Sequence, residues 1–111
     1  MTKKEERLLV YLVDKATLSL PKDWKDTLRV HPMNDGKMGS LYLIPNNLTK
    51  DYKERHFGRQ VSDCHFYDND GVDVIASLYV DDNDYLLELD IWKVNFQPLI
   101  EIPNDFHDIE T

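Results

Sequence analysis

The chain has 111 residues, and its 13 lysines and arginines against 21 aspartates and glutamates give a formal net charge of −8. That length supports a single domain with its own hydrophobic core, since domains typically contain about 100–150 residues, and we expect one domain over residues 1–111. The acidic excess argues against nucleic acid as a partner, because phosphate contacts need clustered Lys and Arg. It argues equally against an anionic membrane surface.

The single cysteine, Cys64, cannot form a disulfide within the chain and fits a reducing compartment. The first residues, Met1 to Glu6, are polar and are followed by no signal-peptide core. No apolar run approaches the roughly 18 residues that a membrane span needs. Together these features predict a cytoplasmic protein that does not bind membranes.

The first predicted element is an amphipathic helix over residues 3–17. Thr2 and Glu5 have the spacing of a capping box at a helix N-terminus. Pro21 prevents the helix from continuing, and a short helical turn after it is expected to carry Trp24 into the core. The apolar residues that recur at helical spacing, and so predict a face on the core, are Leu8, Leu9, Tyr11, Leu12, Val13 and Ala16.

Residues 28–44 have the pattern of a β-hairpin. Strands are expected at 28–31 and 40–44, on either side of a loop whose two glycines tolerate positive φ. Pro32 has no backbone donor for a β-ladder, so we place this hairpin at the edge of a sheet. The polar segment after it is expected to contain a helical turn over Lys50–His56.

The clearest strand pattern lies in residues 60–94. Gln60–Tyr67, Val72–Val80 and Tyr85–Val94 alternate between apolar and polar residues and are separated by short loops rich in Asp, Asn and Gly. Links this short predict a three-stranded antiparallel meander, because parallel strands need a long crossover. With the hairpin and the helix, they predict an α+β domain: an N-terminal helix packed on an antiparallel sheet of about five strands.

The loop lengths also predict how the meander strands pair. A three-residue loop over 69–71, with Gly71 left-handed, and a four-residue loop over 81–84 each fix a register. The expected cross-strand pairs are Phe66–Val74, Cys64–Ala76, Val80–Tyr85, Leu78–Leu87 and Ala76–Leu89.

This register gives the meander one apolar face and one polar face. The apolar face, which the helix is expected to cover, holds Cys64, Phe66, Val74, Ala76, Leu78, Val80, Tyr85, Leu87, Leu89 and Ile91. The opposite face interleaves carboxylates with aromatic rings and holds Asp63, His65, Tyr67, Asp73, Ile75, Ser77, Tyr79, Asp81, Leu86, Glu88, Asp90 and Trp92. Within the C-terminal tail, 96–111, we expect Phe96–Pro103 to cover part of this second face.

The negative charge of the chain is concentrated in the meander. Residues 60–92 contain nine acids and no lysine or arginine, whereas the rest of the chain has 12 acids and 13 bases. The nine acids are Asp63, Asp68, Asp70, Asp73, Asp81, Asp82, Asp84, Glu88 and Asp90. This distribution predicts a local negative potential, which favours a basic partner.

No pattern indicates catalysis, a metal or a cofactor, and we expect a protein that is not an enzyme. Cys64 and His65 are adjacent on a strand, so their side chains point to opposite faces and cannot form a nucleophile–base pair. The four histidines have no zinc-ligand spacing, and no phosphate-binding glycine motif is present. Asp68–Gly71 resembles the start of a calcium loop, but Phe66 and Ser77 stand where ligands are required.

Two interpretations of the acidic–aromatic face remain open. It is either a solvated sheet face or a docking surface for a basic protein, because Tyr and Trp supply rigid contact area and carboxylates complement Lys and Arg. On the second interpretation, the expected partner-binding residues are Asp73, Tyr79, Asp81, Asp82, Asp84, Glu88, Asp90 and Trp92.

Several stretches together resemble a family of small uncharacterised bacterial domains, over roughly residues 20–103. They are Leu20–Trp24, Leu28–Met33, Asp35–Leu41, Phe57–Arg59, Asp70–Val72, Ser77–Asp81, Glu88–Phe96 and Pro98–Ile100. The family supplies no catalytic motif. In size and acidity the chain is also similar to the immunity proteins that are paired with bacterial contact-dependent growth-inhibition toxins.

The resemblance and the charge distribution together lead to a functional expectation. The protein is expected to be an immunity protein that binds and neutralises a cognate toxin domain, such as a basic nuclease, without itself binding nucleic acid. Occlusion of the toxin's active site and binding at an exosite both remain open. The alternative is a stand-alone small domain with an unrecognised enzymatic or small-ligand-binding role.

Overall fold

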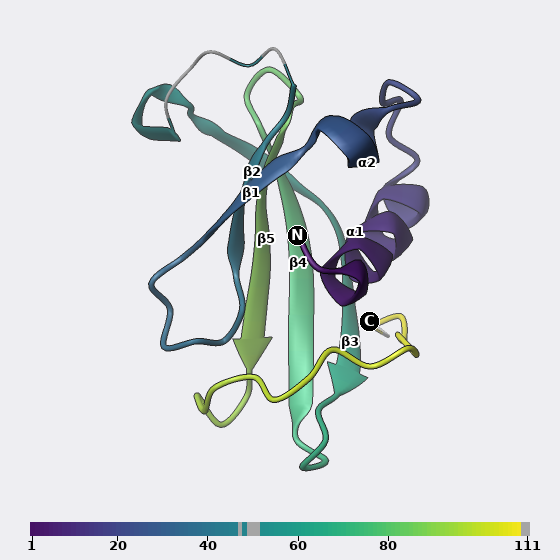
Figure 1. Cartoon of the computed structure of the whole chain (residues 1–111), viewed down its shortest axis with the longest axis vertical. Coiled ribbons are helices and arrows are strands. Elements are labelled where there is room, and N and C mark those ends of the chain that lie inside the picture. The colour runs from purple at the N-terminus through teal and green to yellow at the C-terminus, as the bar shows by residue number, and fades with distance from the viewer. Residues whose placement is uncertain (47, 49–51, 110–111) are drawn as a thin grey trace.

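The computed structural model describes residues 1–46, 48 and 52–109 of the chain (Figure 1). Helices and strands follow one another in the predicted order, with small differences in their bounds. The elements are α1 (Lys3–Ala16), α2 (Trp24–Thr27), β1 (Arg29–Pro32), β2 (Leu41–Ile44), the 3₁₀ turn η1 (Tyr52–Glu54), β3 (Phe57–Tyr67), β4 (Asp73–Asp81) and β5 (Leu86–Lys93).

The five strands of the described residues form one antiparallel sheet in the order β1-β2-β5-β4-β3, and α1 packs on one side of it (Figure 1). This is the predicted α+β architecture, in which the hairpin joins the meander through the pairing of β2 with β5. Pro32 ends the edge strand β1, as its missing backbone donor predicts.

Helix α1 begins and ends where its local sequence dictates. The Thr2 hydroxyl accepts the Glu5 amide and the Glu5 carboxylate accepts the Thr2 amide, which completes the predicted capping box. The helix ends at Ala16, one residue earlier than predicted, because Thr17 adopts a left-handed conformation with φ 54°. Its apolar stripe is buried against the sheet, where Leu8 and Leu12 have no exposed surface.

Of the two hairpins in the meander, the first pairs as predicted and the second does not. Gly71 is left-handed and Phe66 pairs with Val74. In the second hairpin, however, Leu78 pairs with Leu89 instead of Leu87, a displacement of two residues. At Val80, which pairs with Leu86 instead of Tyr85, the shift is one residue. Beyond the bulge it is two residues, and Ala76 pairs with Ile91 instead of Leu89.

Two features produce this displacement. The Asp81 amide donates to the Tyr85 carbonyl, which lengthens the loop by one residue, and a bulge between Tyr79 and Val80 adds a second. Because a two-residue slip returns each side chain to the same face, most of the predicted core survives. Three assignments are wrong: Tyr85 is 47% exposed, whereas Leu86 and Asp81 are buried.

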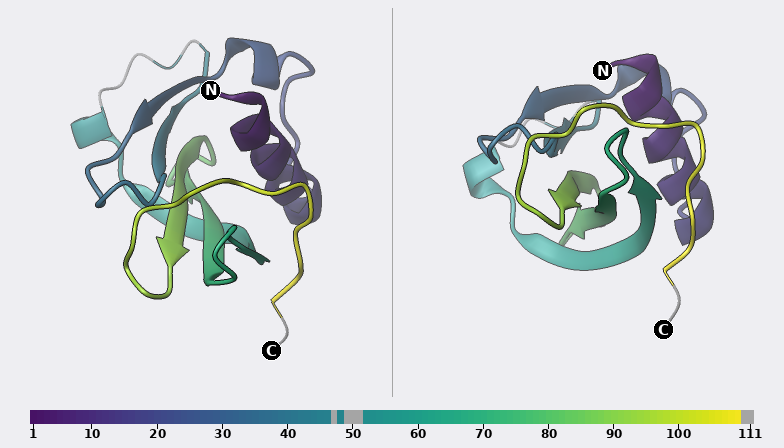
Figure 2. Two further views of the ribbon diagram at one scale, coloured as in Figure 1. Left: turned by 60° about the horizontal axis from the view of Figure 1, so that its bottom comes forward. Right: turned by 90° about the horizontal axis from the view of Figure 1, so that it is seen from below.

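The C-terminal tail crosses the core side of the sheet instead of its opposite face (Figure 2). Ile102 is buried in the core, and Leu99 and Phe106 pack against it. At His107 the tail reaches the edge strand β3, where His107 and His65 exchange backbone hydrogen bonds of 2.8 and 2.9 Å. The tail therefore completes the core layer with Leu99, Ile102 and Phe106, whereas Ile109 lines a hollow with His65, Asp73 and Ile75 on the opposite side of the sheet.

The remaining predicted elements are present in shorter form. Trp24 is half-buried at the start of α2 and packs against the core. The turn expected over Lys50–His56 is observed as η1, and Lys50 and Asp51 lie outside the described residues. No helix in the described part of the chain is long and apolar enough to cross a membrane.

Candidate functional site

The side of the sheet that faces away from α1 carries the candidate site. We call it the open face and define it by the outward residues of the meander strands: Asp63, His65, Tyr67, Asp73, Ile75, Ser77, Tyr79, Glu88, Asp90 and Trp92. Strand alternation places these side chains on one side while their neighbours in sequence enter the core. The predicted interleaving of acids and aromatic rings is confirmed, and no lysine or arginine belongs to this set.

A pair of carboxylates lies at the centre of the open face on β5. Glu88 is opposite Tyr79, and Asp90 is opposite Ser77. Partial burial, repulsion by Glu88 and a hydrogen bond shared with it raise the pKa of Asp90 to about 6, and Asp35 of the β1–β2 loop adds to the rise. Asp90 therefore keeps its proton to a higher pH than an ordinary aspartate, and a cation placed here would release that proton.

Aromatic side chains flank this carboxylate pair. Trp92 lies opposite Ile75, is 43% exposed, and packs against Phe96 with 6.0 Å between ring centroids. Tyr79 packs against Phe57 at 5.3 Å, and burial, followed by the charge of Asp90, raises the pKa of its hydroxyl. The acids thus lie beside aromatic rings, and Tyr and Trp are enriched at protein interfaces.

Asp73 lies at the far end of the same face, at the start of β4. Its Oδ1 is 2.9 Å from Nδ1 of His65, and it pairs with Tyr67 across the strands. The structure therefore places five of the eight predicted partner-binding residues on the open face, which are Asp73, Tyr79, Glu88, Asp90 and Trp92.

Asp81 is not part of this face, and its assignment as a docking residue is wrong. Its side chain is 3% exposed and its Oδ2 accepts from Nε of Arg55 at 3.0 Å. The other carboxylate oxygen accepts the amides of Asn83 and Tyr85, so Asp81 organises the β4–β5 loop. The strand bulge and the basic side chain beneath the loop draw Asp81 inward.

The two remaining predicted residues, Asp82 and Asp84, lie in the β4–β5 loop at the end of the sheet. Both are exposed. Asp84 has a positive φ of 66° and forms an ion pair with Arg59 of β3, whereas the Asp82 amide donates to the His56 carbonyl. They form a separate acidic loop and not a continuation of the central carboxylate pair.

Bases from flanking segments neutralise part of the meander's charge. Lys93 is buried and binds both Asp68 at 2.9 Å and Asp70 at 2.7 Å, and Arg55 binds Asp81. These bases lie just outside residues 60–92, so the count of nine acids without a base overstated the local field. Of the four acids of the open face, Asp63 lies 3.9 Å from Nζ of Lys15, which leaves Asp73, Glu88 and Asp90 to define its negative character.

Sequence reasoning missed two rings that border the site. Tyr42 of β2 is placed beside Glu88 by the β2–β5 pairing, and its ring stacks on His31 with 6.4 Å between centroids. Nothing in the sequence indicated that β2 pairs with β5, so the position of Tyr42 beside Glu88 could not be predicted. Phe57 was likewise outside the predicted strand, which begins three residues earlier than expected.

The described residues contain no group of three or more His, Cys, Asp and Glu side chains arranged to hold a metal ion. Cys64 is buried, and its burial raises the pKa of the thiol to about 12, which makes it a poor nucleophile.

Comparison of the chain with curated proteins and with solved structures finds no match. A family model does match, over residues 1–103, and this range includes α1, which the sequence resemblance had left outside. The matched range covers both layers of the fold and all the residues of the open face. The chain therefore belongs to the family described as Domain of unknown function (DUF6984).

Proposed function

We propose that the protein is an immunity protein, which binds and neutralises a cognate bacterial toxin domain through the open face. The observation that carries this proposal is the combination on one rigid sheet surface of the Glu88–Asp90 carboxylate pair with the exposed ring of Trp92. A basic toxin domain, such as a nuclease, has the complementary charge.

Such a surface combines electrostatic attraction with rigid aromatic contact area. Carboxylates on a face whose outward residues include no lysine or arginine attract a basic protein and accelerate its association. Trp92 and Tyr79 are held on β-strands and have few rotatable bonds, so little side-chain entropy is lost when they become buried in a complex. Phe96, which is 69% exposed beside Trp92, extends the apolar part of the surface.

Two modes of neutralisation fit this surface. The carboxylates can occupy the phosphate-binding cleft of a nuclease, or the face can bind an exosite and block substrate sterically. The two modes differ in competition: a short DNA or RNA ligand displaces the protein from the toxin only in the first mode.

The experiment that tests the proposal is co-expression with the toxin domain encoded next to this gene. We expect growth rescue and a 1:1 complex on co-purification, and we expect both to be lost in the Trp92→Ala, Glu88→Gln double variant. The matched control is the Tyr85→Ala, Asp14→Asn double variant, which removes an exposed ring and an exposed acid that do not belong to the open face. Rescue that persists in the first variant would contradict this interface, and absence of any complex with the wild-type protein would contradict the function.

A further inference from the structure

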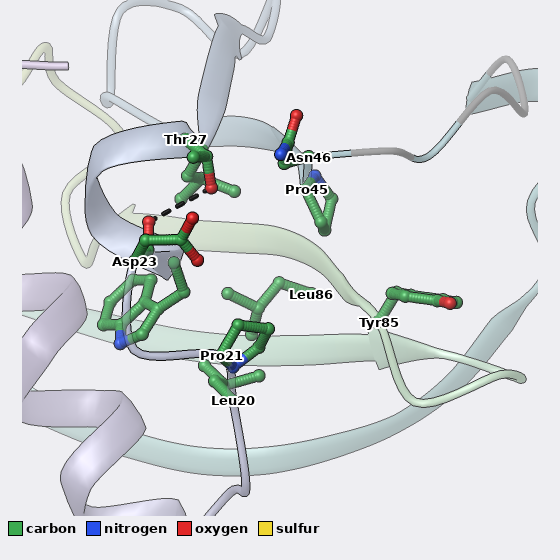
Figure 3. A pocket seen from close by; sticks show the side chains of 10 residues that line it. Leu20, Pro21, Asp23, Thr27, Pro45, Asn46, Tyr85 and Leu86 are labelled. Atoms are coloured by element: carbon green, nitrogen blue, oxygen red, sulfur yellow. Dashed lines mark hydrogen bonds between the residues drawn. The ribbon is translucent and has the colours of Figure 1, made fainter.

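A cavity of about 170 Å³ lies between α2, the segment that precedes it, and the start of β5 (Figure 3). Its wall is mainly apolar and includes Leu20, Leu28 and Leu86. Leu28 and Leu86 belong to the buried core, so the floor of the cavity is fixed by the packing of the sheet. A void of about 150 Å³ in an apolar core holds a benzene-sized molecule, and this cavity is therefore large enough for an apolar group of that size.

One charged side chain is directed into the cavity. Figure 3 shows the carboxylate of Asp23 pointing from α2 toward the space between Leu86 and Pro45. The carboxylate makes no hydrogen bond to the amides of α2, although Asp23 is the residue that precedes this helix. Among the described residues it has neither an ion pair nor a side-chain hydrogen-bond partner, while its backbone carbonyl accepts the Thr27 hydroxyl at 3.1 Å.

The rest of the lining favours a positively charged group near this carboxylate. Trp24 and Tyr85 both line the cavity, and aromatic rings attract cations through their π-electrons. Tyr85 is 47% exposed, so its ring stands at the mouth. None of the described lining residues is a lysine or arginine, and Asp23 is therefore the charge that an entering group meets.

We propose that this cavity is a binding site for a small organic ammonium ion, with an apolar body about the size of a benzene ring and a cationic nitrogen held by Asp23. The apolar body replaces water against Leu20, Leu28 and Leu86, and the nitrogen lies beside the carboxylate of Asp23. This site is separate from the open face and does not depend on the proposed toxin partner.

The test is an NMR titration of the full chain with 2-phenylethylammonium chloride, observing the methyl groups of Leu20, Leu28 and Leu86. We expect saturable shifts confined to the cavity lining, and weaker binding of the neutral isostere 2-phenylethanol. Shifts that do not saturate, that appear mainly elsewhere, or that are equal for the two probes would overturn the proposal.

Two variants isolate the role of the carboxylate. Asp23→Asn is expected to weaken binding of the ammonium probe by about two- to fivefold, the range of an exposed ion pair, without changing binding of the neutral probe. Asp26→Asn is the control, because Asp26 is an exposed acid of α2 that does not line the cavity. Equal affinities in the two variants would contradict the assignment of Asp23.

A third probe distinguishes a free ligand from a protein side chain. N-acetyl-lysine methylamide carries the same cation on a narrower apolar chain and represents the lysine of a partner protein. A small-ligand site predicts that it binds at least about tenfold more weakly than the phenyl compound. Binding of equal strength would contradict a small-ligand site and assign the cavity to a partner's side chain.

Discussion

Nε of Arg55 donates to Oδ2 of Asp81 at 3.0 Å, and the two side chains are 2% and 3% exposed. The guanidinium group also donates to the carbonyls of Leu43 and Leu86, at 2.7 and 2.5 Å. Arg55 therefore joins the segment after η1 to β2, to the end of β4 and to the start of β5. The ion pair is a structural element inside the region that the sequence had assigned to partner binding.

Asp81→Asn is expected to destabilise the fold without directly altering the open face. The change leaves the Arg55 guanidinium buried without a counter-charge, which typically costs about 3–5 kcal/mol. Urea unfolding should show a lower midpoint with an unchanged slope. Asp82→Asn, one residue away and exposed, should stay within about 0.5 kcal/mol of wild type. Equal effects of the two substitutions would contradict a structural role for the ion pair.

Asp68 holds the tail on the core. Its carboxylate accepts the amides of Ile100 at 2.8 Å and Glu101 at 3.0 Å, as well as Nζ of Lys93. Asp68→Asn should therefore accelerate hydrogen exchange of the Ile100 and Glu101 amides at least about tenfold. Asp70→Asn should leave these amides protected, because Asp70 binds Lys93 but no tail amide. Unchanged exchange in Asp68→Asn would exclude this anchor.

The same carboxylate should make the tail sensitive to acid. Burial alone would raise the pKa of Asp68, but the hydrogen bonds from Ile100 and Lys93 hold it below its usual value. A folded pKa below the unfolded value of about 3.9 means that the stabilisation is complete above that pH and disappears as the pH falls through the folded pKa. NMR shifts of Ile102 should therefore change below about pH 4 in wild type, and Asp68→Asn should abolish that dependence.

Asp90 should have the opposite effect on stability. Its pKa of about 6 lies above the unfolded value of about 3.9, so between these pH values the folded state binds more protons and stability falls as the pH rises. The free energy of unfolding of Asp90→Asn, relative to that of wild type, should therefore increase by on the order of 1 kcal/mol from pH 5 to pH 8, after allowance for solvent screening. In a Glu88→Gln background, the midpoint of this pH dependence should move toward pH 4. A stability difference between Asp90→Asn and wild type that does not vary with pH would contradict the interaction of the two carboxylates.

At Gly58 the backbone of β3 lies against the backbone at the end of β4. A Cβ atom there would lie 2.3 Å from the carbonyl oxygen of Asp81. Gly58→Ala should cost about 1–3 kcal/mol through overpacking. Gly71→Ala, at φ 77° with open space around it, should cost less, about 1 kcal/mol for the left-handed backbone. Thermal unfolding of both variants tests this order, and the reverse order would contradict it.

The sequence predicted most of the fold because the deciding interactions are local. The capping box at Thr2 is fixed within a few residues, and so is the turn at Gly71 that pairs Phe66 with Val74. The second hairpin was displaced because a bulge at Tyr79 leaves no distinctive residue in the sequence. The alternation of side chains survived because the displacement was an even number of residues.

The candidate site was less predictable because it depends on bases distant in sequence. Alternation and charge placed Asp81 on the surface, but Arg55, 26 residues earlier in a segment without periodicity, draws it into the interior. Lys93 falls on the core side of β5 and is buried by Asp68, contrary to the usual exposure of lysine. Only the three-dimensional pairing showed which meander acids remain on the open face.

The central claim is that the open face docks a basic protein, and the association rate tests it most directly. The measurement is stopped-flow binding of the neighbouring toxin domain at two salt concentrations. Three proteins are compared: the wild type, the Glu88→Lys, Asp90→Lys double variant and a control. Asp14→Lys with Asp26→Lys is the matched control, because it changes the net charge equally at exposed sites outside the open face.

The account predicts that reversal at Glu88 and Asp90 slows association at low salt by at least about tenfold and weakens its salt dependence. The control should slow association much less. An association rate and salt dependence that remain as in wild type after reversal at Glu88 and Asp90 would contradict docking on the open face.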